Sequence, residues 1–165
     1  MKNYLLMIFV IFIISCSKQE DQKLDNIGVN VDRDINISVK DSAGNDLLDP
    51  ENPQAIRESE IWLYYLIDGK KEKVYIPNLD HPRNFFIFKD HRNYDSSEYI
   101  IRVFPNDEKS NSYPITYIQW NNADTDTIKC EIERTEYEVR CTKVWYNGEL
   151  KWKGNDTWRY FEIIK

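Results

Sequence analysis

Apolar and polar residues alternate along most of the chain. Residues 35–39 read apolar, polar, apolar, polar, apolar, the period of a strand with one face in a core and the other in solvent. Further runs rich in β-branched and aromatic residues follow at 61–67, 73–76, 85–88, 99–104, 115–120, 127–133, 137–146, 149–152 and 158–164. Short strands at this spacing predict an all-β protein, an antiparallel β-sandwich that is immunoglobulin-like or related.

Turn signals separate these runs. Asp68-Gly69 and Asn147-Gly148 supply the positive φ angles that tight hairpins need. The alternation stops at residues 49–60, where Asn52 is suited to cap a helical turn with Pro53 in its first position. The pattern therefore predicts a sandwich with one short helical turn near residues 53–58.

The first residues follow a different pattern, with an unbroken apolar run over residues 4–14. A membrane-spanning helix needs about 20 apolar residues, so this run, preceded by Lys2, is typical of a secretory signal peptide. We interpret residues 1–15 as a signal peptide that is removed. Residues 16–26 are nearly all polar and predict a flexible tether, and residues 27–165 predict one β-sandwich domain.

The sequence IISC at residues 13–16 resembles the lipobox of bacterial lipoproteins, with Ile13 where leucine is commoner. In that family the peptide is cut just before the cysteine, which is lipidated; the resemblance implies a lipid anchor on Cys16. The residues that follow are similar to the short charged signal that sends some lipoproteins of the Bacteroidota to the outer leaflet (Lys18, Glu20 and Asp21). The resemblance implies a cell-envelope protein anchored to the outer membrane, with display at the cell surface as a further expectation.

Residues 35–48 and 61–65 also resemble the start of small β-sandwich lipoproteins of the Bacteroidota. This resemblance is one of general style. It implies the β-sandwich fold and transfers no functional residue.

The acidic composition narrows the range of partners. The chain has a formal net charge of −6, and removal of the leader with Lys2 makes it more negative. Nucleic-acid binding requires a basic surface, so we expect no nucleic-acid partner. Membrane attachment is expected through the lipid on Cys16 and not through surface charge.

Two cysteines lie on neighbouring predicted strands. A hairpin centred on Thr135-Glu136 would place Cys130 opposite Cys141. Disulfides persist in exported proteins, so we predict a bridge between these residues. The alternative is a pair of small buried thiols.

The sequence contains no G-x-S-x-G, H-E-x-x-H or C-x-x-C motif. His81 and His91 flank the predicted strand at 85–88 and are expected at its opposite ends. The acidic residues within 41–51 do not match a calcium-binding loop and are ordinary turn residues. We therefore name no catalytic residue, no metal ligand and no cofactor.

Three tryptophans are candidates for a binding surface. On its predicted strand, Trp62 lies on the face opposite to the one that carries Ile61 and Leu63, which is already apolar. Trp145 and Trp152 flank a tight hairpin with Lys and Glu neighbours. Exposed aromatic patches mark binding surfaces; the alternative is that these rings complete the core. We predict a non-catalytic binding module for a glycan, peptide or protein partner. The alternatives are a surface or periplasmic hydrolase, whose carboxylate pair we do not locate, and an accessory subunit of an outer-membrane complex.

Overall fold

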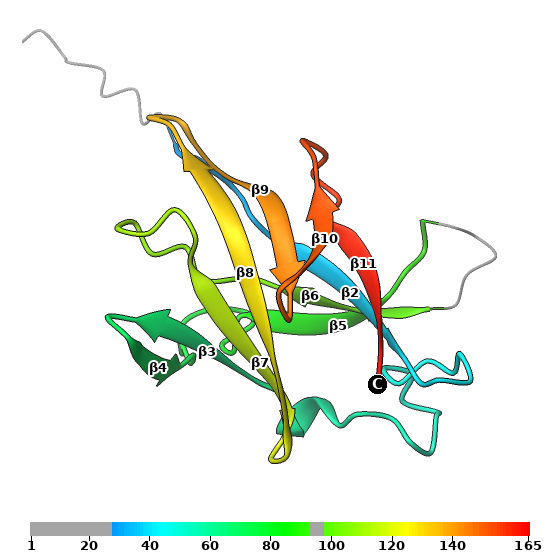
Figure 1. Cartoon of the computed structure of the whole chain (residues 1–165). Coiled ribbons are helices and arrows are strands. Elements are labelled where there is room, and N and C mark those ends of the chain that lie inside the picture. Colours follow the sequence, from blue (N-terminus) through cyan, green and yellow to red (C-terminus); the bar gives the residue numbers. More distant parts are fainter. Residues whose placement is uncertain (1–27, 93–97) are drawn as a thin grey trace, which may run out of the picture.

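The computed structural model describes residues 28–92 and 98–165, so Cys16, the lipobox and the predicted tether lie outside the described residues. Within them the protein is all-β, with two sheets packed as a sandwich and not closed into a barrel (Figure 1). The described helical structure is one 3-10 turn, η1 at Glu58–Glu60. No helix in the described ranges has the length and apolar character needed to cross a bilayer.

The larger sheet has seven strands. Its order is β1 (Asn30–Asp32), β9 (Glu138–Tyr146), β8 (Asp124–Arg134), β7 (Ile115–Asn121), β3 (Trp62–Ile67) and β4 (Lys70–Lys73), with β10 (Glu149–Lys153) also paired to β9. The smaller sheet has four strands. Its order is β11 (Tyr160–Ile164), β2 (Ile35–Lys40), β6 (Tyr99–Val103) and β5 (Phe85–Lys89).

Most neighbouring strands are antiparallel, as predicted, but β1–β9 and β2–β11 are parallel. Both parallel pairs join an early strand to a late one. Parallel strands need a long connection, and most of the chain lies between the members of each pair. Sequence alternation contains no information about such pairings.

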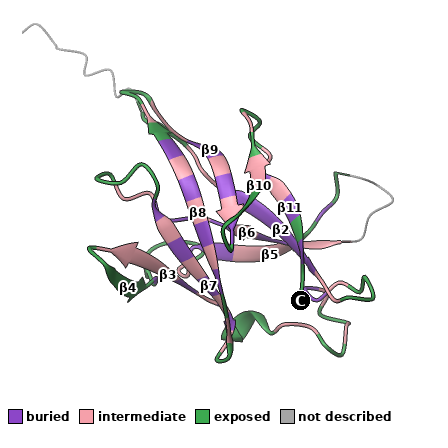
Figure 2. Ribbon diagram, in the orientation of Figure 1, coloured by how far each residue is buried: buried purple, intermediate pink, exposed green. Residues whose placement is uncertain are grey.

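The inner faces of the two sheets form one core. Ile37 and Ile101 of the smaller sheet and Leu63, Ile118 and Ile128 of the larger sheet are completely buried. Along β7 and β8 buried residues alternate with half-buried ones (Figure 2), which confirms the predicted period.

The central strand β2 departs from this alternation, because its outward residues Asn36 and Ser38 are also completely buried. Asn36 Oδ1 accepts a hydrogen bond from Arg102 Nε at 2.9 Å. The Ser38 and Tyr160 hydroxyls are hydrogen-bonded at 3.0 Å. Asn36 Oδ1 and the Ser38 hydroxyl are therefore paired within the protein, whereas the buried Asn36 Nδ2 has no hydrogen-bond partner among the described residues.

The two tight hairpins form as predicted, with positive φ at Asp68, Gly69, Asn147 and Gly148. The strand predicted at 73–76 is wrong, because β4 begins directly after Gly69 and consists of exposed Lys and Glu residues. A strand that follows a two-residue turn must start at the turn, whatever the apolar pattern beyond it.

The helical turn predicted at 53–58 lies instead at η1. Asn52 does cap a turn, since its Oδ1 accepts a hydrogen bond from Gln54 N at 2.9 Å. Its Nδ2 also donates to the Asp46 carbonyl at 2.6 Å. These bonds hold a local turn that does not continue as a helix.

Candidate functional site

Trp62 and Trp145 lie on the same outward face of the seven-stranded sheet. Leu63 of β3 and Ile61, directly before β3, are completely buried, while Trp62 and Tyr64 are half-buried and point the other way. The register carries this face across the sheet, because Tyr64 pairs with Tyr117 and Lys129 pairs with Trp145. We call it the aromatic–lysine face, defined by Trp62, Tyr64, Tyr117, Trp145, Lys71, Lys73 and Lys129.

Each lysine of this face lies over an aromatic ring. Lys73 Nζ is 3.4 Å from the centre of the Trp62 ring, and Lys71 Nζ is 3.8 Å from the centre of the Tyr117 ring. Lys129 Nζ is 4.4 Å from the Trp145 ring. A cation within about 6 Å of a ring centre is attracted by the electrons of the ring face. The rings therefore hold the ammonium groups on the surface of the sheet.

These lysines lack acidic partners among the residues that the structure describes. None of the described lysines that form ion pairs is a member of this face. The paired lysines are Lys40, Lys143, Lys151 and Lys165. Arg83, which is 5.3 Å from the Trp62 ring, is paired with Glu58 at 3.3 Å. The aromatic–lysine face is thus a positive patch on a chain whose formal net charge is −6.

A shallow pocket of about 430 Å³ adjoins the Trp62 ring. Its other lining residues are Ser59, Glu60, Asn121, Asn122 and Ala123. A hydroxyl, a carboxylate and two amides beside an indole offer hydrogen bonds next to an apolar plane, and polar groups of this kind fix the orientation of a ligand. Sequence reasoning missed these residues because they come from the β7–β8 turn and from η1.

Trp152 does not belong to this face. It pairs with Val144 after a register shift in β10 and packs against the buried core. Its ring centre is 5.3 Å from the guanidinium carbon of Arg159. The structure therefore places two of the three predicted tryptophans on one face of the sheet, on strands separated by β7 and β8, and places the third against the core.

The predicted register of the two cysteines is wrong. Cys130 pairs with Val144, and Cys141 pairs with Ile132 beyond a bulge at Thr142 of β9. The hairpin is displaced because the Thr135 hydroxyl accepts a hydrogen bond from Glu138 N at 3.0 Å, which moves the turn toward Glu136-Tyr137.

Cys130 and Cys141 are both buried free thiols in the structure. A hydrogen-bonded contact with the Cys141 sulfur and complete burial raise the pKa of the Cys130 thiol. The two side chains meet in the core despite the changed register. The disulfide stays a prediction for oxidised, exported protein.

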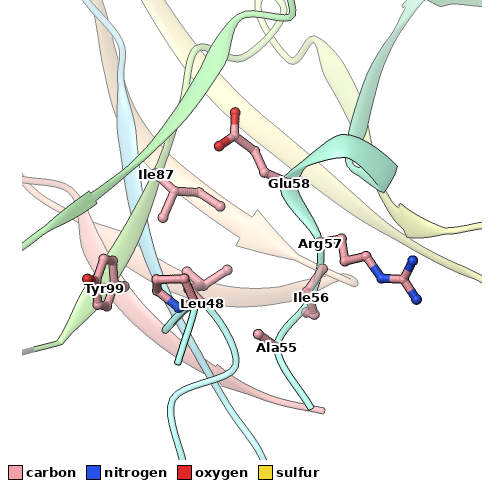
Figure 3. Close-up of a pocket in the computed structure, with 8 residues that line it drawn as sticks. Leu48, Ala55, Ile56, Arg57, Glu58, Ile87 and Tyr99 are labelled. Carbon is pink, nitrogen blue, oxygen red and sulfur yellow. The ribbon is translucent and has the colours of Figure 1, made fainter. Parts of the chain in front are cut away.

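A second pocket, of about 370 Å³, lies between the β2–β3 connection and the smaller sheet. In Figure 3, Ile87 of β5 and Tyr99 of β6 face Leu48 and the segment that carries Ile56. Arg57 and Glu58 are the charged lining residues. The pocket is mainly apolar and opens beside the edge of the sheet.

Asp126 is the centre of a polar network that sequence reasoning missed. Its carboxylate accepts hydrogen bonds from Trp120 Nε1 at 2.8 Å, from Asn147 Nδ2 at 2.6 Å, and from Tyr146 and Lys165. Burial raises the pKa of this carboxyl group, but the hydrogen bonds outweigh burial, so the pKa lies below its ordinary value. Asp126 is an ionised anchor for Lys165.

The acidic residues of 41–51 act as turn acceptors. Asp41 accepts hydrogen bonds from the backbone N–H groups of Ala43 and Asn45 at 2.9 and 2.8 Å. Asp46 Oδ2 accepts one from Tyr99 N at 2.7 Å, which ties this loop to β6. Their oxygens are used by the loop, which agrees with the turn interpretation.

The two histidines flank β5 in the chain, and the predicted strand between them is confirmed. His81, before β5, stacks on Phe86 with ring centres 4.3 Å apart. His91 follows β5 and is exposed.

Comparison with protein-family models, curated proteins and solved structures finds no match for this chain. The aromatic–lysine face is therefore interpreted from its own chemistry.

Proposed function

We propose that this protein is a lipid-anchored, non-catalytic binding module of the cell envelope, and that its aromatic–lysine face holds an acidic glycan. The lipid anchor and the location rest on the lipobox resemblance at residues 13–16. The ligand class rests on one observation: Lys71, Lys73 and Lys129 lie over aromatic rings of an outward sheet face without acidic partners.

The two kinds of side chain match the two features of such a glycan. The C–H faces of sugar rings stack on indole and phenol planes, and carboxylate or sulfate groups accept hydrogen bonds from lysine ammonium groups. The face runs from β4 to β9 across β3, β7 and β8. At about 4.8 Å per strand this distance is about 19 Å, which suits an extended oligosaccharide better than a single sugar.

The hydrolase alternative has less support. Glycoside hydrolysis uses two carboxyl groups whose pKa values are driven apart, with one of them raised. The described aspartates with shifted pKa values are all shifted downward: Asp32, Asp41, Asp90 and Asp126. One close carboxylate pair, Asp124 and Asp126, shares Lys165 as an ion-pair partner.

Affinity electrophoresis tests the proposal. Gels containing polygalacturonate or alginate should retain the protein, and gels containing pullulan, a neutral polymer, should not. Trp145→Ala and Lys129→Gln should each reduce the retention. Lys89→Gln is the matched control, because Lys89 lies 5.7 Å from the Tyr99 ring on the other sheet. Equal mobility in acidic and neutral gels would contradict the proposal.

A further inference from the structure

Strand β5 forms one edge of the four-stranded sheet, with β6 as its neighbour. All five residues of β5 pair with β6 in one register without a bulge. Two flanking backbone bonds show which residues face β6: the Asn84 carbonyl accepts from Phe104 N at 2.9 Å, and Asp90 N donates to the Glu98 carbonyl at 2.8 Å. The even-numbered residues of β5 therefore bond to β6.

In an antiparallel pair the intervening residues direct their N–H and C=O groups to the opposite side. These residues are Phe85, Ile87 and Lys89. In the part of the chain that the structure describes, no backbone hydrogen bond outside the β5–β6 ladder reaches them. Phe85 is only 3% exposed, so the accessible part of this edge is at Ile87 and Lys89, which present unpaired backbone donors and acceptors of the kind that another strand uses.

Edge strands normally carry features that prevent such pairing, including lysines, prolines and bulges. The edge strand β4 of the larger sheet is fully exposed and contains Lys70, Lys71 and Lys73. Strand β5 reads Phe-Phe-Ile-Phe-Lys, so its one charge, Lys89, is at its end. The β4 edge is therefore guarded against a further strand, and the β5 edge is not.

The apolar pocket of about 370 Å³ lies beside this unguarded edge. Ile87, the middle residue of β5, lines it together with Leu48, Ile56 and Tyr99 (Figure 3). Side chains alternate between the two faces of a strand. A strand added to β5 would therefore direct alternate side chains toward the pocket.

We propose that β5 binds an extended peptide segment of a partner protein by strand addition. The backbone of the peptide pairs with Ile87 and Lys89, and an apolar side chain of the peptide fills the pocket beside Ile87. Main-chain pairing supplies the affinity in this binding mode, and the pocket supplies the sequence preference. This site lies on the smaller sheet and is independent of the aromatic–lysine face.

Random peptides displayed on phage, selected on the full-length chain in detergent, test this proposal. Enriched peptides should carry apolar residues at every second position. When one of them binds, hydrogen–deuterium exchange should slow at the amides of Ile87 and Lys89. The amides of Phe86 and Phe88 should be protected already in the free protein, because they pair with β6.

Two variants separate peptide binding from folding. Ile87→Pro removes an outward N–H without removing a bond to β6, and Ile56→Lys places a charge in the pocket without changing β5. Each should weaken peptide binding by about tenfold or more. Leu150→Lys is the control, since Leu150 is 48% exposed on the other sheet.

Three results would overturn the proposal: no enriched peptides, enriched peptides that leave exchange of the Ile87 amide unchanged, or equal binding to Ile56→Lys and Leu150→Lys. The Ile87 amide could instead be protected from exchange in the peptide-free protein and lose this protection on dilution. That result would assign the edge to a second copy of the chain. That result would also overturn the peptide proposal.

Discussion

Two regions of this protein place several cations over aromatic rings, but only the first region pairs those cations with acids. In the first, Arg159 lies over Trp152 and is bound by Asp32 at 2.7 and 2.9 Å. Arg102 lies 5.4 Å from the Trp158 ring and is paired with Asp34 at 3.1 Å. These are closed arrangements, in which the protein satisfies its own charges.

The aromatic–lysine face is the second region. Lys73 and Lys129 make closer ring contacts, at 3.4 and 4.4 Å, and the structure shows no carboxylate bound to them in its described ranges. A cation over a ring is therefore not in itself evidence of a binding site. Lys89 over the Tyr99 ring also lacks an acidic partner in the described ranges, but it is a single charge. The outward face is distinguished by three unpaired lysines on neighbouring strands, and a negative ligand completes that arrangement.

The largest expected effect is in the closed region. Asp32→Ala leaves Arg159, which is completely buried, without its carboxylate. Removing one partner of a buried pair costs about 3–5 kcal/mol, and urea denaturation at pH 7 should show this loss in the free energy of unfolding. The aromatic–lysine face is the open region, because its lysines have no acidic partners among the described residues. Lys129→Met, in this open region, should change the free energy of unfolding by no more than about 0.5 kcal/mol. Similar losses for both variants would remove the distinction between the two regions.

The two tryptophans of the C-terminal hairpin give the next contrast. Trp152→Ala opens a gap against the core, so it should cost about 2 kcal/mol, less than the 3–5 kcal/mol of a fully buried tryptophan. Trp145→Ala and Trp62→Ala remove outward rings and should cost less than about 1 kcal/mol each. Thermal unfolding of the three variants measures the difference. A loss at Trp145 as large as that at Trp152 would place Trp145 in the core.

Much of this contrast depends on local sequence. The alternation in β3 predicts that Trp62 and Leu63 point to opposite faces, and the Asn-Gly turn fixes where β10 begins. Such features involve neighbouring residues, so the sequence alone predicts them. The register of β8 and β9 is an exception. It depends on a hydrogen bond to the Thr135 hydroxyl and on a bulge, and the alternation of apolar residues does not predict either of them.

The charge pairing could not be predicted, because it joins distant parts of the chain. Asp32 and Arg159 are separated by 127 positions. Lys71 reaches the Tyr117 ring only because β3 lies between β4 and β7. Strand order decides these contacts, and alternation does not reveal strand order. The sequence therefore provides the candidate tryptophans, while the lysines that give the face its chemistry come from the sheet topology.

Acid should destabilise the closed region. Hydrogen bonds from Arg159 lower the pKa of Asp32, and the pKa of Asp126 is lowered as well. Each ionised carboxylate contributes its full stabilisation above the ordinary pKa of 3.8, and the contribution is lost as the pH falls through the lowered pKa. The free energy of unfolding should fall below about pH 4 by up to about 1.4 kcal/mol per pH unit for each carboxyl group. Urea denaturation between pH 2 and about pH 7 measures this slope, and a flat profile would contradict it.

The smallest expected effect is the most specific to the open region. Lys73→Gln removes one charge over the Trp62 ring and should leave the free energy of unfolding within about 0.5 kcal/mol of the original. Binding of an acidic polymer should weaken by about two- to fivefold, because one exposed charge contact contributes about 0.5–1 kcal/mol. Added salt should reduce the difference between Lys73→Gln and the unmodified protein, because salt screens exposed charges. Lys89→Gln should match the unmodified protein at every salt concentration. If both glutamine variants lost binding equally, the ligand would be responding to the total charge of the chain, and the unpaired lysines would have no special part in recognition.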